Sequence, residues 1–163
     1  MLVKDFIQGP LIKEIEDMTM RDGKPIHAYL GFQLISSSIE FLGSCLDSYD
    51  WAEKGLSEKR FRLAIDKLFP VKYKKYNNKK KFDLYSNLRC SLVHSSRPGN
   101  FIGLLERKHG CNGLLEEDKM LKICFEDFLS DFKNACNKLI NFIDNRSISG
   151  EKVYCHIISI PQD

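Results

Sequence analysis

Apolar residues recur at spacings of three and four along most of this chain, which predicts a mainly helical protein. The clearest helix covers residues 125 to 143, where Glu126 and Asp127 lie at its positive end. A shorter pattern predicts a first helix that has Pro10 in its first turn. A weaker version of the same spacing predicts three more helices, at residues 25–48, 57–70 (capped by Ser57) and 82–95.

Three other stretches lack the helical spacing. Residues 101 to 105 form a short apolar run that predicts a strand paired with residues 120 to 124, and the β-branched residues 153 to 160 predict another strand. The Asp22-Gly23 pair predicts a turn after the first helix. The expected fold class is therefore all-α: a bundle of four to five helices with a small β appendage formed around residues 101–124 and the C-terminus.

The length of 163 residues and the 43% hydrophobic content fit a single domain, residues 1–163, with one core. No apolar run approaches the roughly 20 residues of a membrane helix, and the first residues lack a basic region followed by an apolar one. The six cysteines include no CxxC pair, as is usual for thiols in a reducing compartment. A cytoplasmic protein without membrane contact is expected.

Three groups of potential metal ligands occur in the chain. Neither His109 with Cys111 nor Cys155 with His156 has a recognisable zinc spacing. An acidic group near Trp51, made of Asp47, Asp50 and Glu53, is more typical of a solvated helix end. No metal site and no cofactor is expected.

Positive charge is concentrated in one strip, residues 72 to 81, which holds six lysines and no acidic residue. The net charge of the chain is only +3, so the rest of the protein is mildly acidic. Lysines neutralise phosphates and tyrosine rings stack on unpaired bases, which favours an RNA partner. The candidate RNA-binding residues are Tyr73, Lys74, Lys75, Tyr76, Lys79, Lys80 and Arg97. A solvated loop and a surface for an acidic protein are the alternatives.

Arg89 and His94 are separated by four residues on the helix predicted at residues 82 to 95. A helical rise of about 1.5 Å per residue places them about 7–8 Å apart along its axis. Arginine binds phosphate and histidine transfers protons near neutral pH, so the pair has the groups needed to cleave RNA through its ribose hydroxyl. Asn87 and Ser91 are candidate auxiliary residues.

Two other interpretations bear on this pair. Arg89 can instead form an ion pair with Asp83 or Glu40 while His94 stabilises a helix end. A second arginine–histidine pair, Arg21 and His27, has five residues between its members but spans the predicted turn, so it lacks one rigid support.

The chain resembles the HEPN superfamily, whose ribonucleases carry an arginine and a histidine separated by four to six residues near a helix end. The resemblance covers residues 25–145 in helix order, and Arg89 and His94 are the motif residues that match. It implies a metal-independent endoribonuclease, a toxin or defence effector, that forms a homodimer and has an antitoxin or regulatory protein as partner. The family commonly has a polar residue after the arginine, where this chain has Cys90. A non-catalytic dimeric module that binds RNA, nucleotides or protein is the alternative.

Overall fold

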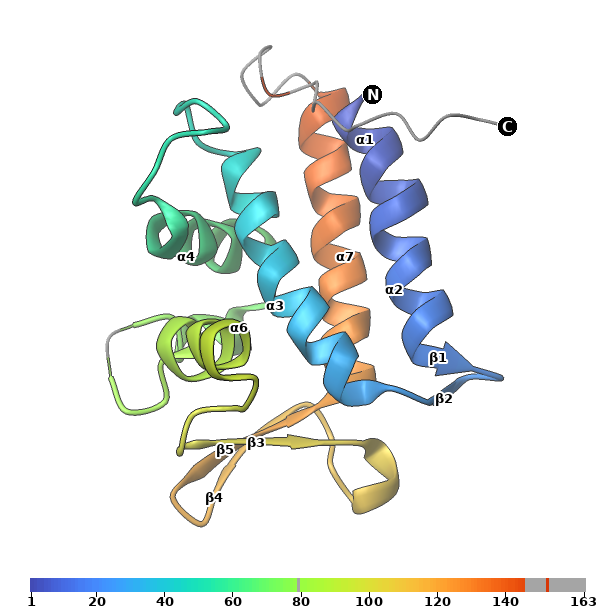
Figure 1. Cartoon of the computed structure of the whole chain (residues 1–163), viewed down its shortest axis with the longest axis vertical. Coiled ribbons are helices and arrows are strands. Elements are labelled where there is room, and N and C mark those ends of the chain that lie inside the picture. The colour runs from blue at the N-terminus through green and yellow to red at the C-terminus, as the bar shows by residue number, and fades with distance from the viewer. Residues whose placement is uncertain (79, 146–151, 153–163) are drawn as a thin grey trace.

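The computed structural model describes residues 1–78, 80–145 and 152 (Figure 1). The first helical region is continuous, because the π-helical turn η1 (Ile7–Leu11) joins α1 (Val3–Phe6) to α2 (Ile12–Thr19). The other helical elements are α3 (Ala28–Ser44), α4 (Ser57–Leu68), α5 (Val71–Lys74), the π-helical η2 (Tyr85–Cys90), α6 (Ser91–Ser95), the 3₁₀ turn η3 (Arg107–His109) and α7 (Phe125–Asp144). Within the described ranges, no helix is long and apolar enough to cross a membrane.

In the part of the chain that the structure describes, five strands form two small sheets. A hairpin pairs β1 (Met20–Arg21) with β2 (Lys24–Pro25), and a mixed sheet has the order β3-β5-β4. In that sheet β5 (Met120–Cys124) runs parallel to β3 (Ile102–Leu105) and antiparallel to β4 (Leu114–Glu117). Figure 1 shows this sheet below the helices, where β5 leads into α7.

The expectation of an all-α bundle with a β appendage is wrong, because the fold is mixed α/β. Ile102, Leu121 and Ile123 of the mixed sheet are buried in the same core as the helices, so the sheet is structural rather than an addition. Asp22 and Gly23 both have positive φ and close a two-residue hairpin where only a turn was expected. The strand predicted at 153–160 lies outside the described residues.

The first helix begins earlier than predicted, at Val3 instead of Pro10. Pro10 lies inside η1. A proline in a helix interior lacks the amide hydrogen and its ring collides with the preceding turn, and the wider π-helical turn gives the ring more room. The prediction that Ser57 caps α4 is also wrong, since the N-cap residue is Leu56 and the Ser57 hydroxyl donates to Glu40 at 2.6 Å.

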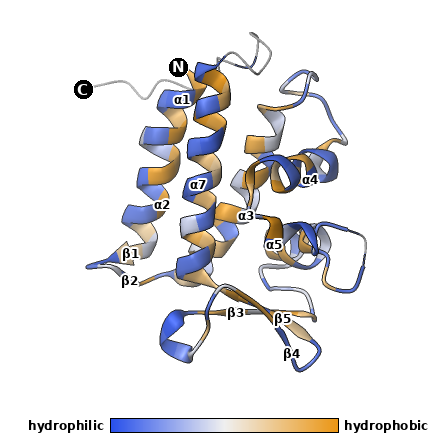
Figure 2. Cartoon of the chain, turned by 180° about the vertical axis from the view of Figure 1, so that it is seen from behind, coloured by the Kyte–Doolittle hydropathy of each residue, from blue (hydrophilic) through white to orange (hydrophobic). Residues whose placement is uncertain are grey.

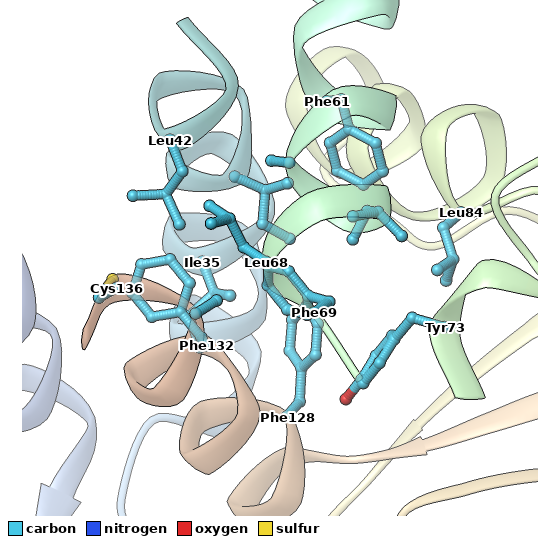
Figure 3. Packing of buried hydrophobic residues seen from close by; sticks show 14 of the residues in the cluster. Ile35, Leu42, Phe61, Leu68, Phe69, Tyr73, Leu84, Phe128, Phe132 and Cys136 are labelled. Atoms are coloured by element: carbon cyan, nitrogen blue, oxygen red, sulfur yellow. The ribbon is translucent and has the colours of Figure 1, made fainter. Parts of the chain in front are cut away.

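The predicted last helix, by contrast, is confirmed as α7, and its apolar side supplies much of the core. Phe128 and Phe132 of α7 pack with residues of α3 and α4 in Figure 3, and Phe32 of α3 contacts the rings of Phe125 and Phe128. Figure 2 shows the corresponding apolar and polar stripes along α2 and α7. The core therefore fixes α3, the helix against which η2 and α6 lie.

Candidate functional site

One helix built of η2 and α6 carries both Arg89 and His94. It lies against α3, because the Gln33 side chain donates to the Leu92 carbonyl at 3.3 Å and the Tyr29 hydroxyl donates to the Ser96 carbonyl. Ser96 adopts a left-handed conformation that ends the helix before Pro98. The predicted helix at residues 82–95 is thus confirmed from Tyr85 onward.

Arg89 lies in a polar pocket of about 310 Å³ between η2, α3 and α4. Its Nη2 donates to Glu40 Oε2 at 2.5 Å, and its guanidinium lies 5.8 Å from the centroid of the Tyr85 ring. The Nε of Arg89 is buried and has no hydrogen-bond partner among the described residues. The pocket is lined by Ser37, Glu40, Phe41, Ser44, Arg60 and Arg89. Of the two ion pairs proposed from the sequence, the pair with Glu40 is the one that forms.

His94 lies on the exposed side of α6 and does not line this pocket. It makes no hydrogen bond or ion pair with any residue that the structure describes. Five residues of α-helix correspond to about 1.4 turns, so Arg89 and His94 leave the helix in different directions. The structure places the two groups on one rigid element without bringing them into one pocket.

The candidate auxiliary residues serve the local fold. The Asn87 side-chain amide donates to the carbonyls of Lys81 and Asp83, at 3.1 and 3.2 Å. The Ser91 hydroxyl donates to the Ser86 carbonyl, five residues earlier, which matches the π-helical spacing. Neither side chain lines the Arg89 pocket.

The residue after the arginine, Cys90, contacts Tyr85. Burial raises the pKa of Tyr85 to about 12, and a hydrogen bond with the Cys90 thiol adds to the effect. The Tyr85 ring also lies against the Arg89 guanidinium.

The two tyrosines of the basic strip are buried rather than exposed. Tyr73 is 1% exposed and donates to Asp131 at 2.8 Å, and burial raises its pKa. Tyr76 is 7% exposed, and its hydroxyl lies 3.4 Å from Glu116. Neither ring offers a free face at the surface on which a base can stack.

The charged residues predicted to bind RNA are mostly on the surface. Lys74 and Lys80 are exposed, and Lys75 donates to Glu116 at 2.8 Å. Arg97 is exposed and contacts only Asn100, at 3.5 Å, among the described residues. Lys79 lies outside those residues. The strip therefore remains a cationic surface. Its described lysines lie on the surface, whereas its tyrosine rings are buried.

The acidic residues near Trp51 are not arranged as ligands of a metal ion. Asp47 forms buried ion pairs with Arg60 at 2.7 Å and Lys152 at 3.2 Å, and Lys152 lies 4.3 Å from the centroid of the Trp51 ring. No group of three or more histidine, cysteine, aspartate or glutamate side chains suited to a metal exists within the described parts of the chain. Cys155 and His156 lie outside them.

Glu40 and the serines of the pocket were not among the predicted site residues. The sequence did contain a signal for them: Gln33, Ser37, Glu40 and Ser44 follow one another at spacings of three and four within an otherwise apolar helix. Such a polar stripe marks a helix side that faces other polar groups or solvent. It faces η2 and α6 here.

Comparisons with protein-family models, with curated proteins and with solved structures return no match. The chemistry of this chain is therefore inferred from its own residues.

Proposed function

We propose that this protein is a metal-independent endoribonuclease of the HEPN type, in which Arg89 binds the scissile phosphate and His94 transfers the proton. The observation that carries the proposal is the placement of both residues on one helix, with Arg89 lining a polar pocket and His94 exposed at the end of α6. The mixed sheet lies between α6 and α7 in the chain.

The proposed reaction needs no group beyond those of the protein and the RNA. His94 accepts the proton of a ribose 2′-hydroxyl, and the resulting oxygen attacks the adjacent phosphorus. Arg89 binds the non-bridging oxygens and stabilises the charge that develops on them. The bond to the 5′-oxygen breaks and that oxygen takes up a proton, which leaves a 2′,3′-cyclic phosphate and a 5′-hydroxyl end.

Glu40 adds a feature to this scheme. In the free protein its carboxylate accepts one hydrogen bond from the Arg89 guanidinium and another from the Ser57 hydroxyl. A bound phosphate has to displace Glu40 or use the donors of Arg89 that Glu40 leaves free, including the unpartnered Nε.

Lysine at position 89 keeps the positive charge but loses the paired donors of the guanidinium. The variant Arg89→Lys is therefore expected to be nearly as inactive in RNA cleavage as Arg89→Ala.

Because Arg89 and His94 point in different directions, we propose that one phosphate is shared by two copies of the chain. Arg89 of one protomer and His94 of its partner then flank the same bond, which agrees with the expected homodimer. A toxin or defence role with an antitoxin or regulator as partner is part of the same proposal.

The double variant Arg89→Ala/His94→Ala is expected to lose at least about 100-fold in RNA cleavage, because a positioned general base alone typically contributes that much. The measurement is the rate of cleavage of transfer RNA in the presence of a chelator, with the cyclic phosphate identified at the new ends. The matched control is Arg21→Ala/His27→Ala, which removes the same two residue types at exposed positions.

Mixing the single variants Arg89→Ala and His94→Ala tests the shared site. A mixed dimer contains one intact site if the two groups come from different copies, so cleavage is expected to return on mixing. Intact transfer RNA with wild-type protein, or equal rates for wild type and the double variant, would contradict the proposed function. Failure of the mixture alone would contradict only the sharing.

The ion pair with Glu40 and the presence of Cys90 after Arg89 favour a second candidate function, a non-catalytic RNA-binding domain. In that case RNA affinity survives the Arg89→Ala/His94→Ala change. It falls when Lys74, Lys75 and Lys80 are neutralised.

A further inference from the structure

We propose that a second pocket, beside the basic strip, binds an unpaired base of single-stranded RNA; this rests on the proposed action on RNA. The pocket has a volume of about 250 Å³ and lies between the chain after α5 and strand β4. Its walls include Lys75, Tyr76, Lys80, Lys81, Phe82 and Glu116. It is separate from the Arg89 pocket and shares no lining residue with it.

Aromatic rings form the apolar part of this pocket. Phe82 lies edge-to-face with Tyr76, at 6.5 Å between centroids, and with Phe101, at 6.4 Å. Phe101 is 40% exposed and packs against Phe82, which lines the pocket. An exposed ring beside a cavity offers the stacking surface that single-stranded nucleic acids use, and the strip's two tyrosines do not supply it.

Lysines lie over the same rings. Lys81 Nζ is 5.0 Å from the centroids of both Phe82 and Phe101, and Lys75 Nζ is 5.1 Å from that of Tyr76. A base on the ring would thus have ammonium groups next to its own phosphate. The combination of cation and aromatic face distinguishes this surface from a merely solvated lysine loop.

Glu116 supplies an acceptor on the pocket wall. Its ion pair with Lys75 lowers the pKa of the Glu116 carboxyl. A carboxylate accepts hydrogen bonds from the amino group of cytosine, whereas the base edge of uracil has no amino group. The pocket is therefore expected to prefer cytosine over uracil.

The pocket is connected to the Arg89–His94 helix. The Asn87 side chain donates to the Lys81 carbonyl, and the Asn87 carbonyl accepts from the Gly99 amide at 2.7 Å. Gly99 in turn accepts from the Ile102 amide, next to Phe101. These hydrogen bonds tie the helix that carries Arg89 and His94 to the segments that carry Lys81 and Phe101.

The test measures the affinity of the full chain for fluorescent eight-nucleotide probes in 2′-O-methyl form, which lack the hydroxyl needed for cleavage. The probes are oligocytidine, oligouridine and a duplex. The test variant Lys81→Gln/Phe101→Leu is compared with Lys59→Gln/Tyr49→Leu, a matched pair in which an exposed lysine also lies over an exposed tyrosine ring, at 4.3 Å.

The test variant is expected to bind oligocytidine at least about tenfold more weakly than wild type, since stacking on one ring contributes about that much or more. The control is expected to stay within about twofold, because the Tyr49 ring, unlike that of Phe101, does not pack against a ring that lines the pocket. Wild type is expected to bind oligocytidine about tenfold more tightly than oligouridine, and Glu116→Gln to reduce that preference.

The inference is overturned if the test variant binds like wild type or if the duplex binds as tightly as the single strands. A polyglutamate peptide that competes as well as RNA would overturn it in favour of an acidic protein partner. Tight binding with no cleavage of transfer RNA would refute the proposed nuclease activity and leave the base pocket standing. If the test variant cleaves transfer RNA normally and binds the probes as tightly as wild type, the base pocket is refuted and the proposed nuclease activity stands.

Discussion

The substitution Gly43→Ala is expected to lower the free energy of unfolding by more than about 3 kcal/mol, because a collision with rigid backbone costs more than the usual overpacking of a core against side chains. A Cβ atom at position 43 would lie 1.8 Å from the backbone carbonyl oxygen of Arg60. Backbone cannot move aside as a side chain can, so α4 must shift away from α3. Alanine favours an exposed helix by about 1 kcal/mol over glycine, which is too little to offset this collision.

Two other helical glycines are the controls. Gly9 has open space around its would-be Cβ, so Gly9→Ala is expected to leave stability unchanged or raise it slightly. At Gly31 the collision is with the Phe125 ring, at 2.3 Å, and the expected loss is intermediate. Chemical denaturation of all three variants is the measurement. A Gly43→Ala protein as stable as Gly9→Ala would show that α3 and α4 are not in the close contact described.

The helices were largely predictable because their apolar spacing reflects the core directly. The pattern at residues 125 to 143 corresponds to α7, whose apolar side meets α3 and α4. The π-helical turn at Pro10 was not predictable in the same way, since it depends on how a proline is accommodated within a helix rather than on spacing. The fold class failed in part because β4, with the sequence Leu-Leu-Glu-Glu, is mostly exposed and does not alternate apolar and polar residues, so it lacks a strand pattern of its own.

The candidate site was predictable in residue type but not in contacts. Sequence spacing put Arg89 and His94 on one helix, but side-chain direction depends on what that helix packs against, and Glu40 lies 49 residues away in the chain. The tyrosines of the strip look like surface residues among lysines. Their burial follows from long-range contacts with Asp131 and Glu116, which no local pattern reports.

A buried ionic network around Asp47 was also invisible from local sequence. The side chains of Asp47, Arg60 and Lys152 are each less than 10% exposed. Arg60 donates further to the carbonyls of Asp50 and Trp51, at 2.6 and 3.2 Å. One carboxylate thus pairs with two buried cations, so its removal is expected to affect both of them.

The substitution Asp47→Ala is expected to lower the free energy of unfolding by about 3–5 kcal/mol, because it removes the carboxylate that pairs with the buried Arg60 and Lys152. The measurement is denaturant unfolding at pH 7. The matched control is Asp50→Ala, since among the described residues the Asp50 carboxylate accepts only from the exposed Ala52 amide, and the backbone contact of Asp50 with Arg60 survives. The Asp50→Ala control is expected to lower the free energy of unfolding by less than about 1 kcal/mol.

The destabilisation by Asp47→Ala is expected to depend on pH in a defined direction. Burial disfavours the ionised Asp47 carboxyl, but hydrogen bonds from Arg60 and Lys152 outweigh it and lower its pKa below the ordinary value of 3.8. A group with a lowered pKa in the folded state stabilises above the unfolded value and loses that contribution as pH falls through the folded one. The difference between wild type and Asp47→Ala should therefore be constant from pH 7 to about pH 5 and shrink below pH 3.8. A difference that is small at pH 7, or that grows in acid, would show that Asp47 is not the counter-charge of these cations.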